Sequence, residues 1–340
     1  MVFLESKASG MLSGESVRKR DRMDNVRRCF EDCFLARGVR NCGGNINMAA
    51  LFRNGYFYVL AAAFFSSAWV LDTFYQKASL SNSVAMALFV TVMTGCMALF
   101  TWKVKSPSIV IKQPEREALL LLVYFAVWLI VNVGLWNIFF NKHILFSNGI
   151  SFWLCLVVIP SLMLRRRGYR LADVGLTTSS LLSNLRAALL SGACFGGMML
   201  ITTPGGKYLL GLEQSAGELT AGLAVSFLVA FLFAGFHEEF FFRAILQTRI
   251  SQALNSKISG LMVTTLLFSI YHLPFRLFDT GSTGDFTHAL AVCFTEGLFG
   301  GLILGFLWLR TNNLIAPVFV HSVIDAISGY ESIMTKYHFW

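Results

Sequence analysis

Long apolar stretches alternate with short polar segments over most of this 340-residue chain. Most of them are close to the roughly 20 residues that a helix needs to cross a bilayer. Hydrocarbon offers no partner to open backbone groups, so each stretch is predicted to be helical. The pattern predicts an all-α, polytopic transmembrane bundle of about eight to nine spans. The nine stretches cover approximately residues 54–71, 83–102, 118–140, 144–164, 187–206, 221–246, 258–275, 289–309 and 311–330.

The composition agrees with a membrane protein. Hydrophobic residues make up 55%, charged residues 14%, and the mean hydropathy is +0.61, whereas a soluble domain is about 25% charged. One soluble core cannot hide that many apolar side chains. A disordered chain and a nucleic-acid binder are therefore excluded, and the expected surrounding is a lipid bilayer. The seven cysteines are an odd number, and four lie in apolar stretches, which argues against a secreted disulfide scaffold.

Residues 1–53 form a predicted basic, cytosolic N-terminal tail. No cleavable signal peptide is apparent near Met1. Met48 is a plausible alternative initiator, so whether residues 1–47 are translated is left open. With this tail inside, 23 Lys and Arg fall on the cytoplasmic side and five on the other, as the positive-inside rule requires. We expect a multi-pass protein with a cytoplasmic N-terminus, in a bacterial inner membrane or, in a eukaryote, an endomembrane.

Charge divides the remaining chain into two predicted regions. The first five spans contain no charged residue, whereas each of the last four carries ionisable residues within the apolar stretch. Residues 54–175 are therefore interpreted as accessory transmembrane helices, and residues 180–330 as a catalytic membrane core. In the eighth span Gly297, Gly301 and Gly305 fall four apart on one face, a ridge typical of close helix packing.

The sixth span ends in two adjacent carboxylates among phenylalanines, Phe236-His237-Glu238-Glu239-Phe240-Phe241-Phe242-Arg243. On a helix, Glu239 and Arg243 are neighbours one turn apart and can pair. Glu238 points about 100° further round and lacks that partner. A desolvated carboxyl beside a second one is suited to act as a general base near neutral pH. A purely structural charge cluster is the alternative.

The seventh span contains His272, and the ninth places His321 and Asp325 one turn apart. Such a His–carboxylate pair can fix a tautomer, bind a metal or donate to an oxyanion. Counted at about 1.5 Å per residue from the nearest cytoplasmic Lys or Arg, these residues and Glu238 all lie roughly 16–22 Å deep. The estimate requires the sixth helix to continue to about Arg249. Convergence at one depth predicts a shared site, and Glu296, at a similar depth, is left open as a further member.

These elements resemble a known family pattern. Glu238-Glu239-x-x-x-Arg243, Phe268-x-x-x-His272 and His321-x-x-x-Asp325 are similar to the three motifs of the CAAX protease and bacteriocin-processing (CPBP, or Abi) family. That family includes the type II CAAX prenyl endopeptidases. The resemblance covers roughly residues 180–330, with further similarity at Arg165–Gly175 and in Asn312-Asn313-Leu314-x-x-Pro317.

The resemblance implies an intramembrane endopeptidase that uses a glutamate-activated water. By motif position, Glu238 would be the general base, and His272 would hold and polarise the water. His321 and Asp325 would stabilise the oxyanion, while Glu239 and Arg243 would support the site. The prenyl-endopeptidase branch typically has Asn at the last position, whereas this chain has Asp325. The implied partner is therefore a membrane-anchored or lipid-associated peptide or protein substrate, with prenylation left open.

No metal cofactor is expected, although a zinc ion remains an alternative. The HExxH zinc pattern is absent, because no His stands three positions after Glu238. Two His and a carboxylate still make a possible three-ligand set, namely His272 and His321 with Glu238 or Asp325. The competing function is non-proteolytic: a bacteriocin-immunity factor, or a transporter whose buried charges carry protons or substrate.

Overall fold

The computed structural model describes residues 54–75, 80–139, 145–278 and 284–336, so the predicted N-terminal tail lies outside the described residues. Every regular element among them is a helix, which confirms the predicted all-α class. The chain order is α3 (Gly55–Tyr75), α4 (Leu80–Phe100), α5 (Pro114–Phe139), α6 (Leu145–Phe152), η1 (Trp153–Val158), α7 (Ile159–Arg166), η2 (Leu171–Val174), α8 (Leu181–Thr202), α9 (Pro204–Gly211), α10 (Ala216–Ala230), η3 (Phe231–Gly235), α11 (Phe236–Glu239), η4 (Phe240–Gln247), α12 (Thr248–Ala253), α13 (Lys257–Tyr271), α14 (Leu273–Phe278), α15 (Phe286–Val292), η5 (Cys293–Gly297), α16 (Leu298–Thr311), α17 (Ile315–Ser328) and α18 (Tyr330–Lys336).

Six described helices are long and apolar enough to cross a membrane: Gly55–Tyr75, Gly149–Arg166, Leu181–Thr202, Ala216–Ala253, Lys257–Leu277 and Phe286–Thr311. Two further apolar helices, Ala87–Phe100 and Ile315–Ser328, are shorter. The predicted eight to nine spans are therefore not confirmed, although a helix, α5, also occupies the third predicted stretch. The last predicted span is shortened because Asn312 adopts a left-handed conformation with φ 43°, so that α17 begins only at Ile315.

The sixth predicted span is one continuous helix from Ala216 to Ala253, which confirms that it passes Arg243 and reaches Arg249. It contains two π-helical stretches, η3 and η4, on either side of the short segment α11. Where η4 meets α12, the side-chain hydroxyl of Thr248 donates to the carbonyl of Arg243, five residues earlier, at 3.2 Å. Interruptions of this kind often accompany functional sites, because they change which side chains share a helix face. Here they flank the Glu238–Glu239 pair.

A third π-helical stretch, η1, accommodates Pro160 in the helix that runs to Arg166. The N–H of Ile159 donates to the carbonyl of Leu154, five residues back. In the same register the carbonyl of Cys155 would face Pro160, which has no N–H to offer. The Tyr124 hydroxyl donates to that carbonyl instead, at 2.7 Å. A side chain of α5 therefore completes the backbone hydrogen bonding of this helix.

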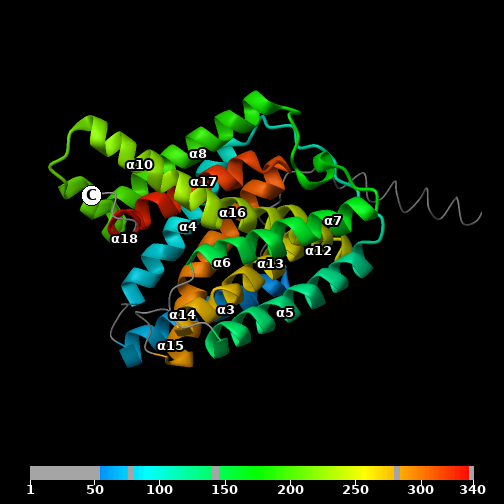
Figure 1. Ribbon diagram of the computed structural model, residues 1–340, viewed down its shortest axis with the longest axis horizontal. Coiled ribbons are helices and arrows are strands. Elements are labelled where there is room, and N and C mark those ends of the chain that lie inside the picture. Colours follow the sequence, from blue (N-terminus) through cyan, green and yellow to red (C-terminus); the bar gives the residue numbers. More distant parts are fainter. Residues whose placement is uncertain (1–53, 76–79, 140–144, 279–283, 337–340) are drawn as a thin grey trace, which may run out of the picture. The chain divides into compact units, whose positions relative to one another are not determined.

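Helix α17 lies in the middle of the C-terminal group of helices. It packs against α8, α10, η3 and α16, and Figure 1 shows it running between α8 and α16. The approach to η3 is close, because a Cβ built on Gly235 would lie 2.4 Å from the hydroxyl oxygen of Ser322. Only glycine fits there, and the close contact brings the residues that follow Gly235 next to those that surround Ser322.

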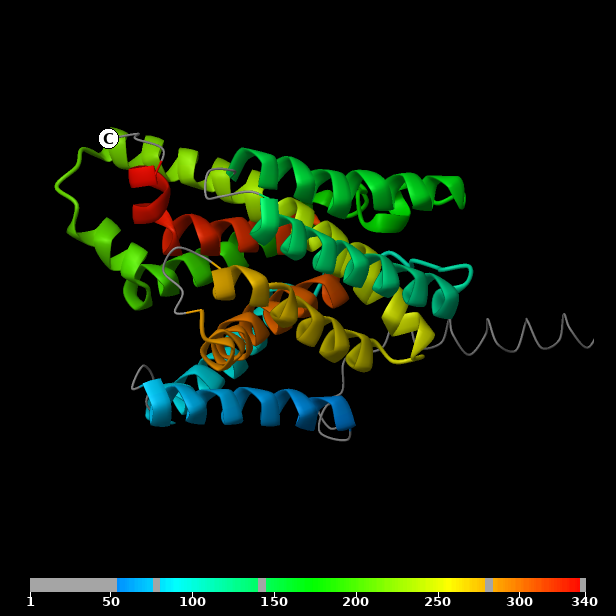
Figure 2. The ribbon, with the colours of Figure 1, turned by 60° about the horizontal axis from the view of Figure 1, so that its bottom comes forward.

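Helix α16 packs against α13 through the predicted glycine ridge. A Cβ on Gly297 would lie 3.0 Å from the Cα of Ser269, and one on Gly301 would lie 2.9 Å from Thr265 Cγ2. These backbone approaches confirm the packing interpretation of the ridge. On the far side of this pair, α3 contacts both α13 and α15, and Figure 2 shows it along the edge of the bundle.

The end of the long helix is fixed to α5 by a buried ion pair. Arg249 and Glu117 are almost completely buried, and Arg249 Nε donates to Glu117 Oε2 at 2.9 Å. The other oxygen of Glu117 accepts from the Tyr169 hydroxyl at 2.7 Å, and burial raises the pKa of that phenol. Arg249, from which the depth of Glu238 was counted, is thus buried within the protein, and its partner comes from a predicted accessory helix.

Gly301→Ala is expected to lower the free energy of unfolding by about 1–3 kcal/mol, because the added methyl group must displace the Thr265 side chain and its backbone. Gly300→Ala is the matched control, since its Cβ would only reach ordinary contact, 3.8 Å from the Phe268 ring. Thermal unfolding of both variants in detergent checks this. Equal melting temperatures of the two variants would contradict the interpretation that Gly301 packs closely against α13.

Candidate active site

The two adjacent carboxylates, Glu238 and Glu239, are both buried inside the helix bundle. They belong to α11, where the long helix continues between its two π-helical stretches. Buried charges are tolerated only where partners satisfy them. The surroundings of the two residues differ sharply, which separates their possible roles.

Glu239 is held on both of its oxygens. Arg243 Nε donates to Oε2 at 2.9 Å, and His321 Nδ1 lies 2.9 Å from Oε1. Since a carboxylate only accepts, the Nδ1 atom of His321 carries the proton in this contact. The predicted Glu239–Arg243 pair is therefore present, and Glu239 additionally joins the long helix to α17. No local pattern in the sequence indicated this second bond.

Phe268 explains part of the second motif physically. Its ring lies under the guanidinium of Arg243 at 4.6 Å, a favourable cation–π arrangement. Its carbonyl oxygen lies 2.8 Å from Nδ1 of His272, so that nitrogen is the donor and Nε2 keeps a lone pair. His272 is the C-terminal cap of α13, because Pro274 has no N–H with which to continue the hydrogen-bond ladder, and α14 starts at Leu273.

The four residues predicted to share a site lie close together. Glu238 Oε2 is 4.0 Å from His272 Nε2 and 3.9 Å from His321 Nε2. His321 Nε2 also lies 3.4 Å from Asp325 Oδ2. Glu238 Oε2 is buried and has no hydrogen-bond partner among the described residues. A carboxylate oxygen and two imidazole nitrogens thus converge on one small region, as the depth estimate predicted.

Two further residues of this region were not predicted. Tyr271 is 2% exposed, and its hydroxyl donates to Glu238 Oε1 at 3.4 Å. His237 is completely buried beside Phe152 and Trp153, and neither of its ring nitrogens has a hydrogen-bond partner among the described residues. Both are sequence neighbours of motif residues, but helical spacing alone did not reveal which of the adjacent rings reaches Glu238.

Glu296, left open above, lies outside this cluster. Its side chain is 61% exposed and pairs with Arg276 at 2.6 Å. The residue belongs to the π-helical stretch η5, and its carboxylate is engaged by Arg276 of α14 at the exposed surface. Equal depth was thus no guarantee of a shared position, because rotation about the helix axis also matters.

The donor atoms of the site lie further apart than the ligands of a bound zinc ion. Zinc bonds of 2.0–2.1 Å in tetrahedral geometry place ligand atoms about 3.3 Å apart, whereas Glu238 Oε2 lies 3.9–4.0 Å from the two histidine nitrogens. In the part of the chain that the structure describes, no group of three or more His, Cys, Asp or Glu residues forms a possible metal site.

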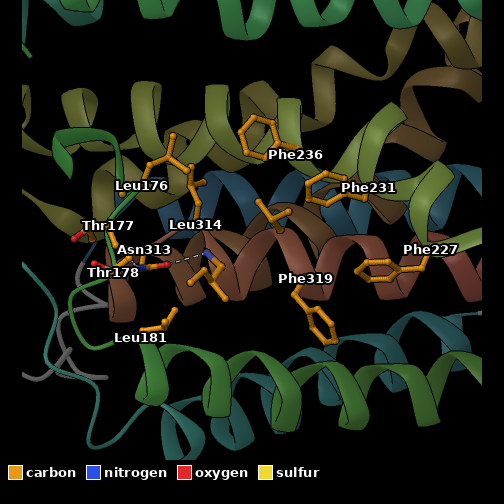
Figure 3. A pocket seen from close by; sticks show the side chains of 13 residues that line it. Leu176, Thr177, Thr178, Leu181, Phe227, Phe231, Phe236, Asn313, Leu314 and Phe319 are labelled. Atoms are coloured by element: carbon orange, nitrogen blue, oxygen red, sulfur yellow. Dashed lines mark hydrogen bonds between the residues drawn. The ribbon is translucent and has the colours of Figure 1, made fainter. Parts of the chain in front are cut away.

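An apolar pocket of about 430 Å³ lies between the long helix and α17. Figure 3 shows Phe227, Phe231 and Phe236 along the long helix, with Leu176, Thr177, Thr178 and Leu181 gathered at one end. Phe236 is two residues before Glu238, and the lining residue Val318 is three before His321. The pocket is therefore built on the same two helices as the charged cluster. It is lined by Gly175, Leu176, Thr177, Thr178, Leu181, Phe227, Phe231, Phe236, Asn313, Leu314, Ile315, Val318 and Phe319.

Comparison with known families supports the resemblance found in the sequence. Residues 220–327 match the family model described as Rce1-like, type II CAAX prenyl endopeptidase Rce1-like. The match contains all three motifs, from Glu238 to Asp325, and confirms similarity to the CAAX protease and bacteriocin-processing family. It is shorter than the predicted 180–330. No curated protein and no solved structure matches the chain.

Arg243→Ala is expected to lower the free energy of unfolding by about 3–5 kcal/mol, because it leaves Glu239 as a buried charge without its arginine. The steady-state amount of protein should fall as well. Arg276→Ala is the matched control, since the Arg276–Glu296 pair is largely exposed and should change stability by at most about 1 kcal/mol. Membrane abundance and detergent melting measure both effects. A stable, abundant Arg243→Ala protein would show that the pair is hydrated.

Proposed function

We propose that this chain, whose residues 220–327 resemble the CAAX protease family, is an intramembrane endopeptidase that activates water with Glu238. One observation carries the proposal. The oxygen Glu238 Oε2 is buried without a hydrogen-bond partner among the described residues, and it faces two histidine nitrogens at 3.9–4.0 Å. That separation suits a water molecule bridging the groups at ordinary hydrogen-bond lengths of about 2.8 Å.

His272 and Glu238 would both accept from that water. The Phe268 carbonyl holds the proton of His272 on Nδ1, so Nε2 offers a lone pair, and Glu238 Oε2 offers another. As the water oxygen attacks the scissile carbonyl carbon, Glu238 takes one of its protons. When the C–N bond breaks, the same proton passes to the leaving amine, and the carboxylate is regenerated.

His321 and Asp325 would stabilise the oxyanion that forms on the former carbonyl oxygen. The Nδ1 proton of His321 is directed to Glu239, so a protonated Nε2 is the donor left for the oxyanion. Asp325 lies 3.4 Å from that nitrogen and is 38% exposed. It can orient His321 as a carboxylate, or donate itself only when protonated. Glu239 and Arg243 would fix the position of His321.

The substrate would be a membrane-anchored or lipid-associated peptide. The matching family model describes prenyl endopeptidases, and the 430 Å³ apolar pocket beside α11 and α17 could hold an apolar chain of the substrate while its peptide bond lies near Glu238. Asp325 departs from the Asn typical of the prenyl branch, so a prenyl group is one of several apolar chains that this proposal allows. The cytoplasmic position of the N-terminus is part of the same proposal.

Glu238→Gln should abolish cleavage while abundance and melting stay nearly unchanged, because glutamine keeps the shape but cannot accept the proton. The assay uses purified protein in liposomes and matched peptides with and without a C-terminal prenylated cysteine. Glu296→Gln, which removes an exposed charge outside the site, should retain full turnover. Substantial cleavage by Glu238→Gln would exclude the general-base role. A wild type inactive on every membrane peptide would instead favour the immunity-factor or transporter alternative.

Treatment with a chelator is expected to leave turnover unchanged, since Glu238 and His272 can position a water without a metal. Elemental analysis of the active, purified protein before and after chelation provides the measurement, with a zinc protease treated in parallel as the positive control. If stoichiometric zinc were lost together with activity, and both returned on adding zinc, His272 and His321 with Glu238 or Asp325 would be reassigned as ligands.

A further inference from the structure

We propose that Tyr271 is a positioning residue that fixes the orientation of the Glu238 carboxylate, with one oxygen bonded to the tyrosine and the other free to act as the base. Its hydroxyl donates to Oε1 and leaves Oε2 directed at His272 and His321. The inference rests on the proposed function, and it adds a residue at a position that the second motif, Phe268-x-x-x-His272, leaves unspecified.

The carboxyl group of Glu238 needs such a partner. Rotation about the terminal bond of a glutamate is broad, so its own torsional preference does not keep the carboxylate plane aligned with the histidines. The neighbouring Glu239 is held on both oxygens, whereas the only hydrogen bond to Glu238 from a described side chain is that of Tyr271, at 3.4 Å. The reactive oxygen is the one left without a bond.

The ring of Tyr271 is itself tightly held. The Trp128 ring of α5 stacks on it with centroids 6.1 Å apart and planes 23° from parallel. Phe242 of the long helix packs against it at 5.2 Å, and Phe275 at 5.5 Å. A hydroxyl on a fixed ring presents its hydrogen bond from a constant position. The same packing should keep the ring in place when the hydroxyl alone is removed.

Tyr271→Phe should therefore lower kcat by roughly tenfold, which corresponds to the lower limit of the contribution of one hydrogen bond to a charged group. KM should change by less than about twofold. Melting should stay close to the wild-type value. Tyr124→Phe is the matched control: it also removes a hydroxyl that donates a hydrogen bond, but to the Cys155 carbonyl, so it should lower stability and leave kcat unchanged. An unchanged kcat in Tyr271→Phe, or equal losses in both variants, would overturn the proposal.

Infrared difference spectroscopy separates this proposal from the proteolytic one, because it needs no turnover. The carboxyl band that disappears in Glu238→Gln identifies Glu238, and Tyr271→Phe should shift that band while Tyr124→Phe should not. A shifted band in a protein without peptidase activity would support the contact and reject the proposed function. An unshifted band in an active enzyme would reject the role of Tyr271 alone. If Tyr271→Phe fails to accumulate, a fluorotyrosine is placed at position 271 instead. The frequency of the Glu238 carboxyl band is then expected to change with the acidity of the fluorinated phenol.

Discussion

The carboxylate of Glu239 is completely buried, and the cost of removing it from water constrains everything around it. Its two oxygens require two donors, which Arg243 and His321 supply at 2.9 Å each. The Arg243 guanidinium in turn lies over Phe268. One desolvated charge therefore holds together the long helix, α13 and α17, and these are the helices that place Glu238 opposite the two histidines.

Much of this site could be predicted because its signals are local. Apolar stretches identified the helices, the spacing of Glu239 and Arg243 predicted their pair, and depth counting brought His272, His321 and Asp325 to Glu238. These inferences need only a helical repeat and the length of a membrane span. Depth alone was not sufficient for Glu296, whose direction depends on rotation in a π-helical stretch that the apolar pattern does not reveal.

What the sequence did not reveal depends on partners far apart in the chain. Glu117 and Arg249 are 132 residues apart, and nothing in either local pattern indicated their contact. The Tyr271 ring is fixed by Trp128 from α5, another long-range contact. Hydropathy also could not predict the number of spans. The left-handed backbone at Asn312 and the π-helical turns change where a helix ends without changing its hydropathy. The roles of the site residues and the region boundaries stay predictions.

The Glu117–Arg249 pair also affects how the protein is made. During synthesis α5 emerges more than a hundred residues before α12, so Glu117 is already available when Arg249 is made. An arginine buried without a counter-charge is costly, and the earlier synthesis of its carboxylate partner avoids that penalty. Expression of residues 180–340 alone would present Arg249 to the insertion machinery with no such partner. The order of synthesis, and not only the folded state, therefore connects α5 to the end of the long helix.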